Sequence, residues 1–134
     1  MKVTLSSIVV NDQARARQFY TEKLGFMVKT DIPMGEYSWL TVTSPEGVAG
    51  VELVLEPAGH PAAREYQQAL YRDGIPATSF ESSDIRAEFE TLRSRGVVFR
   101  TPPSQAGPAI VAAFDDTCGN WIQLHQVQAQ SAPQ

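Results

Sequence analysis

The sequence predicts an α+β fold built from two βαβββ modules whose curved sheets form a cleft. Three observations support this prediction: an internal repeat, matching helix signals in each half, and short strands in which apolar residues alternate with polar ones. Residues 5–56 and 77–126 follow the same order of strand, helix and three strands, displaced by about 71 residues. We therefore expect one domain made of two related modules.

The first module is expected over about residues 3–56. The run LSSIVV predicts a strand, Asp12 is a candidate helix N-cap, and Gly25 ends the helix that follows. Three further strands are predicted in FMVKT, YSWLTVT and VELVLE. In the last of these, strand alternation turns Glu52 away from the helix. The buried face of this helix is expected to consist of Ala16, Phe19, Tyr20 and Leu24.

The second module is expected over about residues 76–127, with a helix that starts after Asp84 and ends at Gly96. Its apolar face consists of Ile85, Phe89 and Leu92. Between the modules, residues 60–74 predict a connector helix that begins at Pro61, ends at Gly74 and buries Ala63, Tyr66 and Leu70. Residues 128–134 have no periodicity, and we expect a disordered tail there.

Composition excludes several classes of partner. The formal net charge is −4, and acidic and basic residues are interspersed, so no basic stripe exists to bind nucleic acid. No apolar run approaches the roughly 20 residues that cross a membrane. The single cysteine, Cys118, cannot form an internal disulfide, and we expect it to be a turn residue. A lone cysteine also agrees with a cytoplasmic protein.

Polar and aromatic side chains are expected on the sheet faces that turn away from the helices. Period-two alternation assigns residues from both modules to these faces. A hollow lined in this way is typical of a small-molecule site. The candidate ligand-binding residues are Ser7, Tyr37, Trp39, Ser79, Trp121, Gln123 and His125, with Glu52 as the candidate catalytic residue.

Two stretches carry a family resemblance. VVNDQARARQFYTEKLGF and FDDTCGNWIQL resemble the opening strand and helix, and the closing turn and strand, of the vicinal oxygen chelate superfamily. This superfamily includes glyoxalase I, extradiol dioxygenases and bleomycin-resistance proteins, and the resemblance covers about residues 3–127. It implies the glyoxalase/bleomycin resistance/dioxygenase-like fold, but that fold hosts lyases, isomerases, dioxygenases, epimerases and binding proteins.

The resemblance also implies where a divalent metal would bind. Enzymes of the superfamily take one ligand from the first and last strand of each module, which corresponds to Leu5, Glu52, Ala77 and Gln123 in this chain. Only Glu52 is an ordinary strong ligand, and catalytic metals usually keep about three protein ligands. A metal site would have to use Glu52, Gln123 and His125, so the ligand set is incomplete and no cofactor is firmly predicted.

Three functions remain open. The first two need no metal: ligand binding in the cleft, or acid/base chemistry by Glu52 as in an isomerase or lyase. The alternative is a metal-dependent lyase or dioxygenase of the glyoxalase I or extradiol type. Glu52 is also explained as a solvated glutamate or one held by an arginine.

The other candidate residues have structural explanations as well. Tyr37, Trp39 and Trp121 either stack on an apolar or aromatic ligand or bury against a second subunit. His125 either binds the ligand or lies at the rim, and His60 is expected to be a helix-entry residue. The resemblance implies a homodimer, and it leaves open whether modules pair within or between chains.

Overall fold

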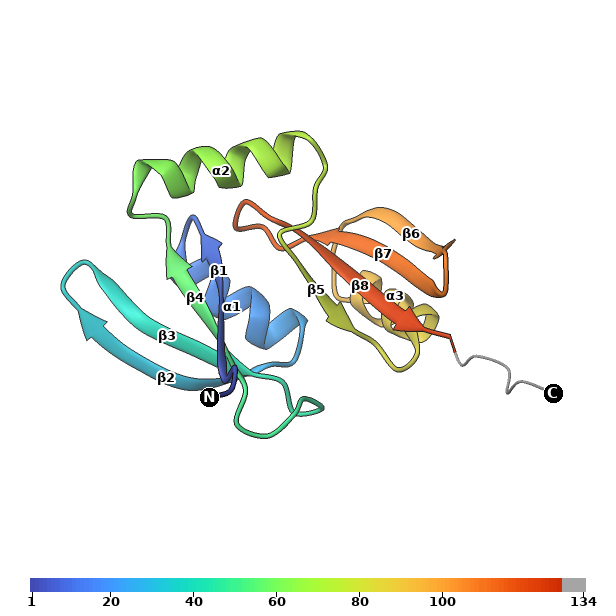
Figure 1. Ribbon diagram of the computed structural model, residues 1–134, viewed down its shortest axis with the longest axis horizontal. Helices are drawn as coiled ribbons and strands as arrows, with labels where there is room; N and C mark the ends of the chain where they lie inside the picture. The colour runs from blue at the N-terminus through green and yellow to red at the C-terminus, as the bar shows by residue number, and fades with distance from the viewer. Residues whose placement is uncertain (129–134) are drawn as a thin grey trace.

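The computed structural model describes residues 1–128 and contains two modules joined by a helix (Figure 1). In the first module, β1 (Leu5–Val10) leads into α1 (Gln13–Gln18), which continues as the π-helical segment η1 (Phe19–Lys23). Three strands follow: β2 (Met27–Met34), β3 (Tyr37–Thr43) and β4 (Glu52–Pro57). The predicted order of strand, helix and three strands is confirmed for this half.

The second module repeats the same order. After α2 (Pro61–Arg72) come β5 (Thr78–Glu81), α3 (Ile85–Ser94), β6 (Phe99–Ala106), β7 (Ala109–Asp115) and β8 (Trp121–Val127). The two sheets have matching strand orders, β1-β4-β3-β2 and β5-β8-β7-β6. In each sheet the first strand of the module pairs in parallel with the last, and the other neighbours are antiparallel. The α+β fold of two βαβββ modules is thus confirmed.

Strand alternation separates a buried face from an open face in each sheet. In the first sheet the buried face holds Leu40, Val42 and Leu55, while Tyr37 and Trp39 remain 45% and 38% exposed. One hydrophobic cluster contains the buried faces of both sheets together with residues of α1, η1 and α3. Aromatic contacts join the modules across this cluster, with ring centroids 6.2 Å apart for Phe19 and Phe114. A shared core therefore fixes the two modules against each other.

The helix boundaries follow the predicted signals. The side chain of Asp12 accepts a hydrogen bond from the backbone N–H of Arg15 (3.0 Å), and Asp84 does the same for Ala87 (3.1 Å). Both contacts satisfy a backbone donor that a helix start leaves unpaired. Gly25 has a φ of 79°, in the left-handed region that ends a helix and that other residues adopt at a cost.

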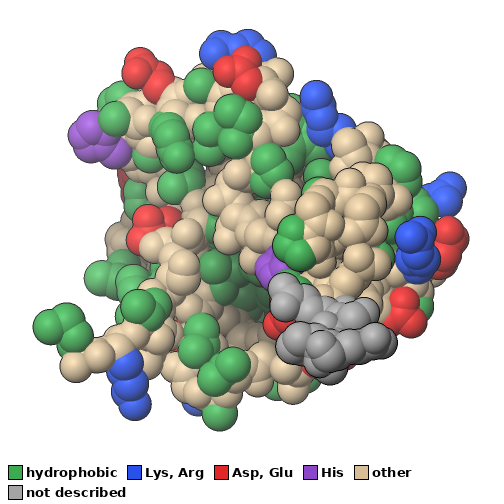
Figure 2. Space-filling model, turned by 45° about the vertical axis from the view of Figure 1, so that its right-hand side comes forward, with side chains coloured by type: hydrophobic (Ala, Val, Ile, Leu, Met, Phe, Trp, Pro, Cys, Tyr) green, Lys and Arg blue, Asp and Glu red, His purple; other side chains and the backbone are tan. Residues whose placement is uncertain are grey.

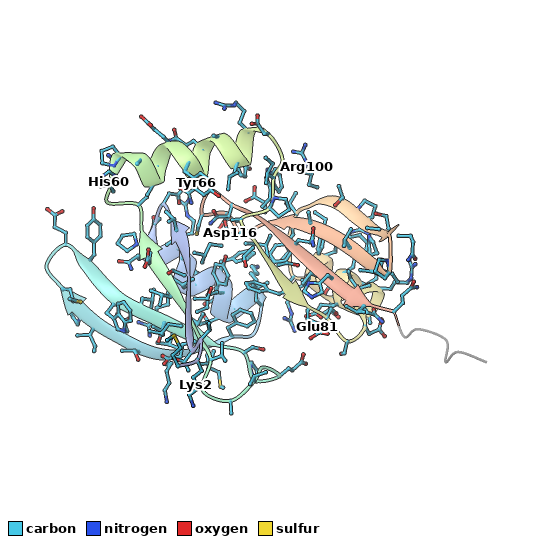
Figure 3. All side chains as sticks on the ribbon, viewed as in Figure 1. Lys2, His60, Tyr66, Glu81, Arg100 and Asp116 are labelled. Carbon is cyan, nitrogen blue, oxygen red and sulfur yellow. The ribbon has the colours of Figure 1, made fainter. Side chains whose placement is uncertain are left out.

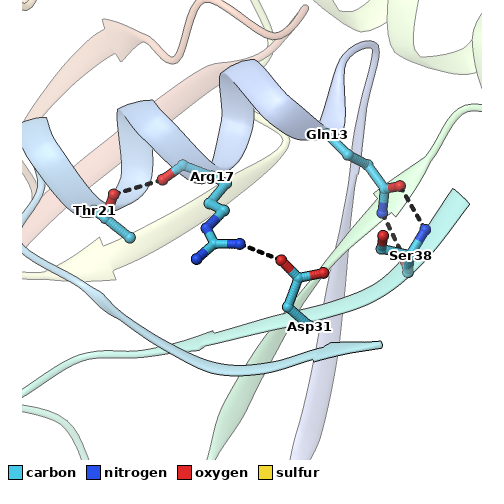
Figure 4. Close-up of polar contacts among 5 residues, drawn as sticks. All are labelled: Gln13, Arg17, Thr21, Asp31 and Ser38. Atoms are coloured by element: carbon cyan, nitrogen blue, oxygen red, sulfur yellow. Dashed lines mark hydrogen bonds and ion pairs between the residues drawn. The ribbon is translucent and has the colours of Figure 1, made fainter. Parts of the chain in front are cut away.

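Polar contacts also attach α1 to the first sheet (Figure 4). The Gln13 amide donates to the carbonyl of Ser38 (2.9 Å) and accepts from the backbone N–H of Ser38 (3.0 Å). One turn later, Arg17 forms an ion pair with Asp31 of β2. The hydroxyl of Thr21 donates to the carbonyl of Arg17 (2.7 Å), within the helix itself. The start of α1 is therefore held in a fixed position over β3.

The connector helix α2 begins as predicted but buries a different residue. His60 is its N-cap, with Nδ1 accepting from the backbone N–H of Ala62 (3.0 Å), and Pro61 occupies the first turn. The prediction that Tyr66 is buried was wrong: Tyr66 is 67% exposed, and the neighbouring Gln67 is 7% exposed. Hydrogen bonds help to fix the rotation of this helix, because the Gln67 amide donates to groups in both modules.

Two further predictions concern membrane-spanning segments and the C-terminal tail. No helix among residues 1–128 is long and apolar enough to span a membrane. The predicted tail, 128–134, lies outside the described residues except for Gln128, whose backbone N–H donates to the carbonyl of Pro108 (3.0 Å).

Candidate functional site

The molecular surface is hollowed between the two modules (Figure 2). A pocket of about 300 Å³ lies there, lined by β1, β3, β4 and the loop before β4 from the first module and by β5 from the second. Its walls include the rings of Phe26 and Phe80, whose centroids are 5.5 Å apart. We call this space the intermodule pocket; its volume is at the lower end of the range for small-molecule sites.

Glu52 stands at the start of β4 and lines the intermodule pocket. Its Oε1 accepts a hydrogen bond from the hydroxyl of Thr41 (2.8 Å), a side chain that is fully buried. Leu5 pairs with Glu52 on the neighbouring strand, and Val54, which faces the same way as Glu52, is 4% exposed. Glu52 therefore lies beside an apolar surface with one neutral hydrogen-bond donor.

Ser79, Gln123 and His125 form a hydrogen-bonded cluster on the open face of the second sheet. Ser79 Oγ lies 2.6 Å from His125 Nδ1 and accepts from Gln123 Nε2 (3.2 Å). Because Ser79 Oγ accepts from Gln123, its own proton is free to form the hydrogen bond with His125 Nδ1.

The aromatic candidates occupy different environments. Trp39 and Tyr37 are partly exposed on β3. Trp121 is already enclosed: its ring stacks on Tyr71 at 4.7 Å with an interplanar angle of 2°, its Nε1 donates to the Tyr71 carbonyl (2.8 Å), and the Arg100 guanidinium lies 5.2 Å from its ring centroid. These contacts join α2 to the second sheet.

The structure brings some predicted site residues together and separates others. Glu52 and Ser79 line the intermodule pocket. Tyr37 lines a different pocket, of about 880 Å³, beneath α2. The remaining candidates line neither of these two pockets: Ser7, Trp39, Trp121, Gln123 and His125.

The residues at the expected metal positions do not fit a catalytic metal. Leu5 and Glu52 pair as expected, but the partner of Gln123 is Ser79 rather than Ala77, which lies two residues earlier on the chain. The four positions then provide one carboxylate, one amide, one hydroxyl and one hydrocarbon side chain that cannot bind a metal, whereas catalytic metals usually take about three strong protein ligands. Among residues 1–128, no three His, Cys, Asp or Glu side chains cluster to hold an ion.

A buried polar network lies between the modules, and sequence reasoning missed it. Asp116, labelled in Figure 3, is fully buried and accepts hydrogen bonds from Tyr20 Oη (2.7 Å), Asn120 Nδ2 (2.8 Å) and the backbone N–H groups of Cys118 (2.7 Å) and Asn120 (3.1 Å). Burial raises the pKa of Asp116, although hydrogen bonds from Asn120 and Tyr20 oppose the change. Burial, followed by the charge of Asp116, raises the pKa of the Cys118 thiol to about 12.

The pocket beneath α2 was also missed. It is bounded by the start of α1, the β2–β3 turn, the end of β4 and the β7–β8 turn, and it includes the inner face of α2. Tyr71 Oη in its wall donates to Asp115 Oδ2 (2.8 Å), and this hydrogen bond, followed by burial, raises the pKa of Tyr71. The only sequence signal was the amide at position 67 on the inner side of a helix.

Comparisons with known proteins agree with the fold. A sequence model of the Glyoxalase/Bleomycin resistance protein/Dioxygenase superfamily matches residues 3–124. The chain is 51% identical to YurT, an uncharacterized protein of Bacillus subtilis, over 126 residues that cover 94% of this chain and 99% of YurT.

Solved structures are similar over nearly the whole chain. The crystal structure of UcmS2 shares 35% identity with a TM-score of 0.79, covering 93% of this chain and 97% of UcmS2. TnmS3, described as an antibiotic binding protein from Streptomyces sp. CB03234, shares 30% identity with a TM-score of 0.75, covering 96% of this chain and 97% of TnmS3.

Proposed function

Because the chain belongs to the Glyoxalase/Bleomycin resistance protein/Dioxygenase superfamily, we propose that it binds an apolar or aromatic small molecule in the intermodule pocket without a metal ion. One observation carries this proposal: aromatic rings and aliphatic side chains line the pocket, and of the positions where a metal would be held only Glu52, the single strong ligand, and Ser79 reach it. Such a lining favours burial of apolar ligand surface.

A similar protein supports the choice of binding over catalysis. TnmS3 is described as an antibiotic binding protein, and it matches this chain over almost its full length. Antibiotics are small molecules, so we infer a sequestering role for this chain toward a compound that fits the intermodule pocket. The fold alone does not select this role, since it also supports several reactions.

A second candidate function is acid/base chemistry by Glu52. The observation that favours it is the position of this carboxylate at the wall of a pocket that Phe26 and Phe80 also line, with one hydrogen bond from Thr41. A carboxylate within reach of a bound substrate can remove a proton from a carbon next to a carbonyl group.

Two measurements test these proposals. Metal analysis of protein purified without chelator should find less than about one tenth of an ion per chain, and treatment with EDTA should leave the melting temperature unchanged. Stoichiometric zinc, nickel, manganese or iron that is lost together with stability on chelation would refute the metal-free proposal.

The second measurement is a thermal-shift screen of planar aromatic compounds against the protein and its Glu52→Gln variant. A ligand at 100 times its Kd stabilises the fold by about 2.7 kcal/mol. If the protein only binds the compound, Glu52→Gln should keep this stabilisation. If Glu52 is an acid/base catalyst, the variant should lose turnover of the compound that the screen identifies. Glu56→Gln is the matched control, because Glu56 lies on the same strand but does not line the intermodule pocket.

We further propose that the protein is a homodimer in the cytoplasm. Apolar side chains remain exposed on the β2–β3 hairpin, and the single cysteine is buried and unpaired, as expected for a reducing compartment. The exposed hairpin side chains are Met27, Ile32, Met34, Tyr37 and Trp39. Sedimentation velocity should give twice the chain mass of 14.7 kDa; a monomer at high micromolar concentration would refute the dimer.

A further inference from the structure

The pocket beneath α2 is separate from the intermodule pocket. Its volume is about 880 Å³, and within residues 1–128 the two pockets share no lining residue. This volume lies within the range of small-molecule sites. In the ribbon view, α2 spans the side of the molecule where the two modules meet (Figure 1).

The amide of Gln67 has a fixed orientation at the pocket wall. Its Nε2 donates toward three acceptors: the carbonyl oxygens of Val9 (2.8 Å) and Cys118 (3.0 Å), and Oδ1 of Asn120 (3.2 Å). Turning the amide over would place its oxygen against these three oxygens, so that orientation is excluded. The side-chain oxygen, Oε1, must therefore point the other way.

Gln67 Oε1 is an acceptor without a partner. Among residues 1–128 it receives no hydrogen bond, although every fully buried side-chain nitrogen or oxygen there has one. Oε1 is therefore reached from the pocket that Gln67 lines, even though the residue is only 7% exposed. A half-enclosed acceptor of this kind gains most from a ligand that donates a hydrogen bond to it.

Acidic side chains outnumber basic ones in the lining of the pocket. Three carboxylates line it, from Asp12, Glu36 and Asp115. Of the two arginines, Arg64 already donates to the carbonyl of Ala58 (2.7 Å), and Arg72 lies 3.5 Å from the carboxylate of Asp73, outside the pocket. The pocket therefore favours positive charge and hydrogen-bond donors over anions.

We propose that the pocket beneath α2 is a second ligand site, which takes a planar aromatic molecule bearing an amine. The ring would lie against Tyr37 and Tyr71, which line the pocket, and the amine would donate to Gln67 Oε1 or to a carboxylate of the lining. This site does not depend on the intermodule pocket or on the absence of a metal there.

The test compares two probes that share an indole ring, tryptamine and indole-3-acetate. Each is titrated into the full chain labelled with ¹⁵N, and the signals of the Gln67 side-chain amide and the Gly119 backbone N–H are followed. Tryptamine should shift both signals with saturation and bind at least about tenfold more tightly than indole-3-acetate. Failure of both probes to shift these signals, or equal binding of the two, would overturn the proposal.

Variants locate the bound probe. Ala14→Trp fills the pocket from the exposed start of α1 and should weaken tryptamine binding at least about tenfold, whereas Ala87→Trp at an exposed position of α3 should not. Glu36→Gln, in the β2–β3 turn, should weaken tryptamine binding about threefold or more. This variant replaces Ala14→Trp as the test if Ala14→Trp does not fold. Unchanged binding in the folded variants would reject the site.

Glu52→Gln distinguishes this site from the intermodule pocket. It should leave the tryptamine affinity within about twofold, because Glu52 lines only the other pocket. Loss of tryptamine binding in Glu52→Gln, with shifts at Ser79 and Phe80 instead of Gln67 and Gly119, would place the ligand between the modules and refute the second site.

Discussion

Tyr20→Phe tests whether the buried network around Asp116 holds the modules together. The substitution keeps the ring, which is fully buried, and removes only the hydroxyl that donates to Asp116 Oδ2 at 2.7 Å. Asp116 keeps its contacts with Asn120 and Cys118, so the carboxylate is not left without partners. The measured loss therefore reports one hydrogen bond between residues 96 positions apart.

The expected magnitude follows from the charge of the acceptor. A hydrogen bond to a charged group contributes about 1.5–3 kcal/mol to stability. For 134 residues the entropy of unfolding is about 0.28 kcal/mol/K, so each kcal/mol shifts the melting temperature by about 4 °C. Tyr20→Phe should lower the melting temperature by about 5–11 °C at neutral pH.

The loss should shrink in acid. The tyrosine hydroxyl stabilises the ionised carboxylate more than the neutral acid, so its removal raises the pKa of Asp116 further above the unfolded value. When the folded pKa of a group is raised, the folded protein loses stability as the pH rises through that pKa. Tyr20→Phe should lose more stability in this way than the wild type. Below the unfolded pKa, where Asp116 is protonated in both the folded and the unfolded state, the difference should fall to the roughly 0.5–1.5 kcal/mol of a neutral hydrogen bond.

Urea unfolding followed by circular dichroism at about pH 8 and about pH 3 measures both values. Tyr66→Phe is the matched control, because the same atom is removed from a side chain that is 67% exposed, and it should change stability by less than about 0.5 kcal/mol. A loss for Tyr20→Phe that equals the control, or one that grows as the pH falls, contradicts the reasoning.

Three further predictions concern other parts of the chain. Cys118, buried and with a pKa of about 12, should react with iodoacetamide at least about 100-fold more slowly than glutathione, and rapid labelling of native protein would show that the thiol is accessible. Gly25→Ala should lower the free energy of unfolding in urea by about 1–2 kcal/mol, because alanine is strained at a φ of 79°. No atom lies within 4 Å of the added Cβ, so no clash adds to this cost, and a stability change near zero would mean that the turn adopts another conformation. Trp121→Phe removes the hydrogen bond to the Tyr71 carbonyl and should speed amide hydrogen exchange in α2 about fivefold; unchanged protection would show that the bond does not hold the helix.

Much of the fold could be predicted from the sequence because its signals are local. The N-cap at Asp12 and the left-handed glycine at position 25 involve residues within one helical turn of the boundary they mark. Strand alternation correctly left Trp39 on the open face, and its neighbours on the opposite face, Leu40 and Val42, lie in the core. The repeat then implied that both halves use the same topology, which the two matching sheets confirm.

The candidate site could be predicted only in part, since its details depend on register and on distant partners. Ser79, rather than Ala77, pairs with Gln123, because strand pairing set by backbone hydrogen bonds determines which residues are neighbours. Trp121 alternates to the open face as predicted, yet Tyr71 of the connector helix stacks on it. No local pattern indicates that these two rings meet.

The sequence by itself determined the two modules, their helix ends and the faces of their strands, along with the shortage of metal ligands. Tertiary structure decided the environment of Gln67, the buried network of Asp116 and the two pockets. The physical reason is distance along the chain: Gln67 meets Asn120 across 53 positions and Tyr20 meets Asp116 across 96. Periodicity specifies which way a side chain points, but only the packed fold specifies what it meets.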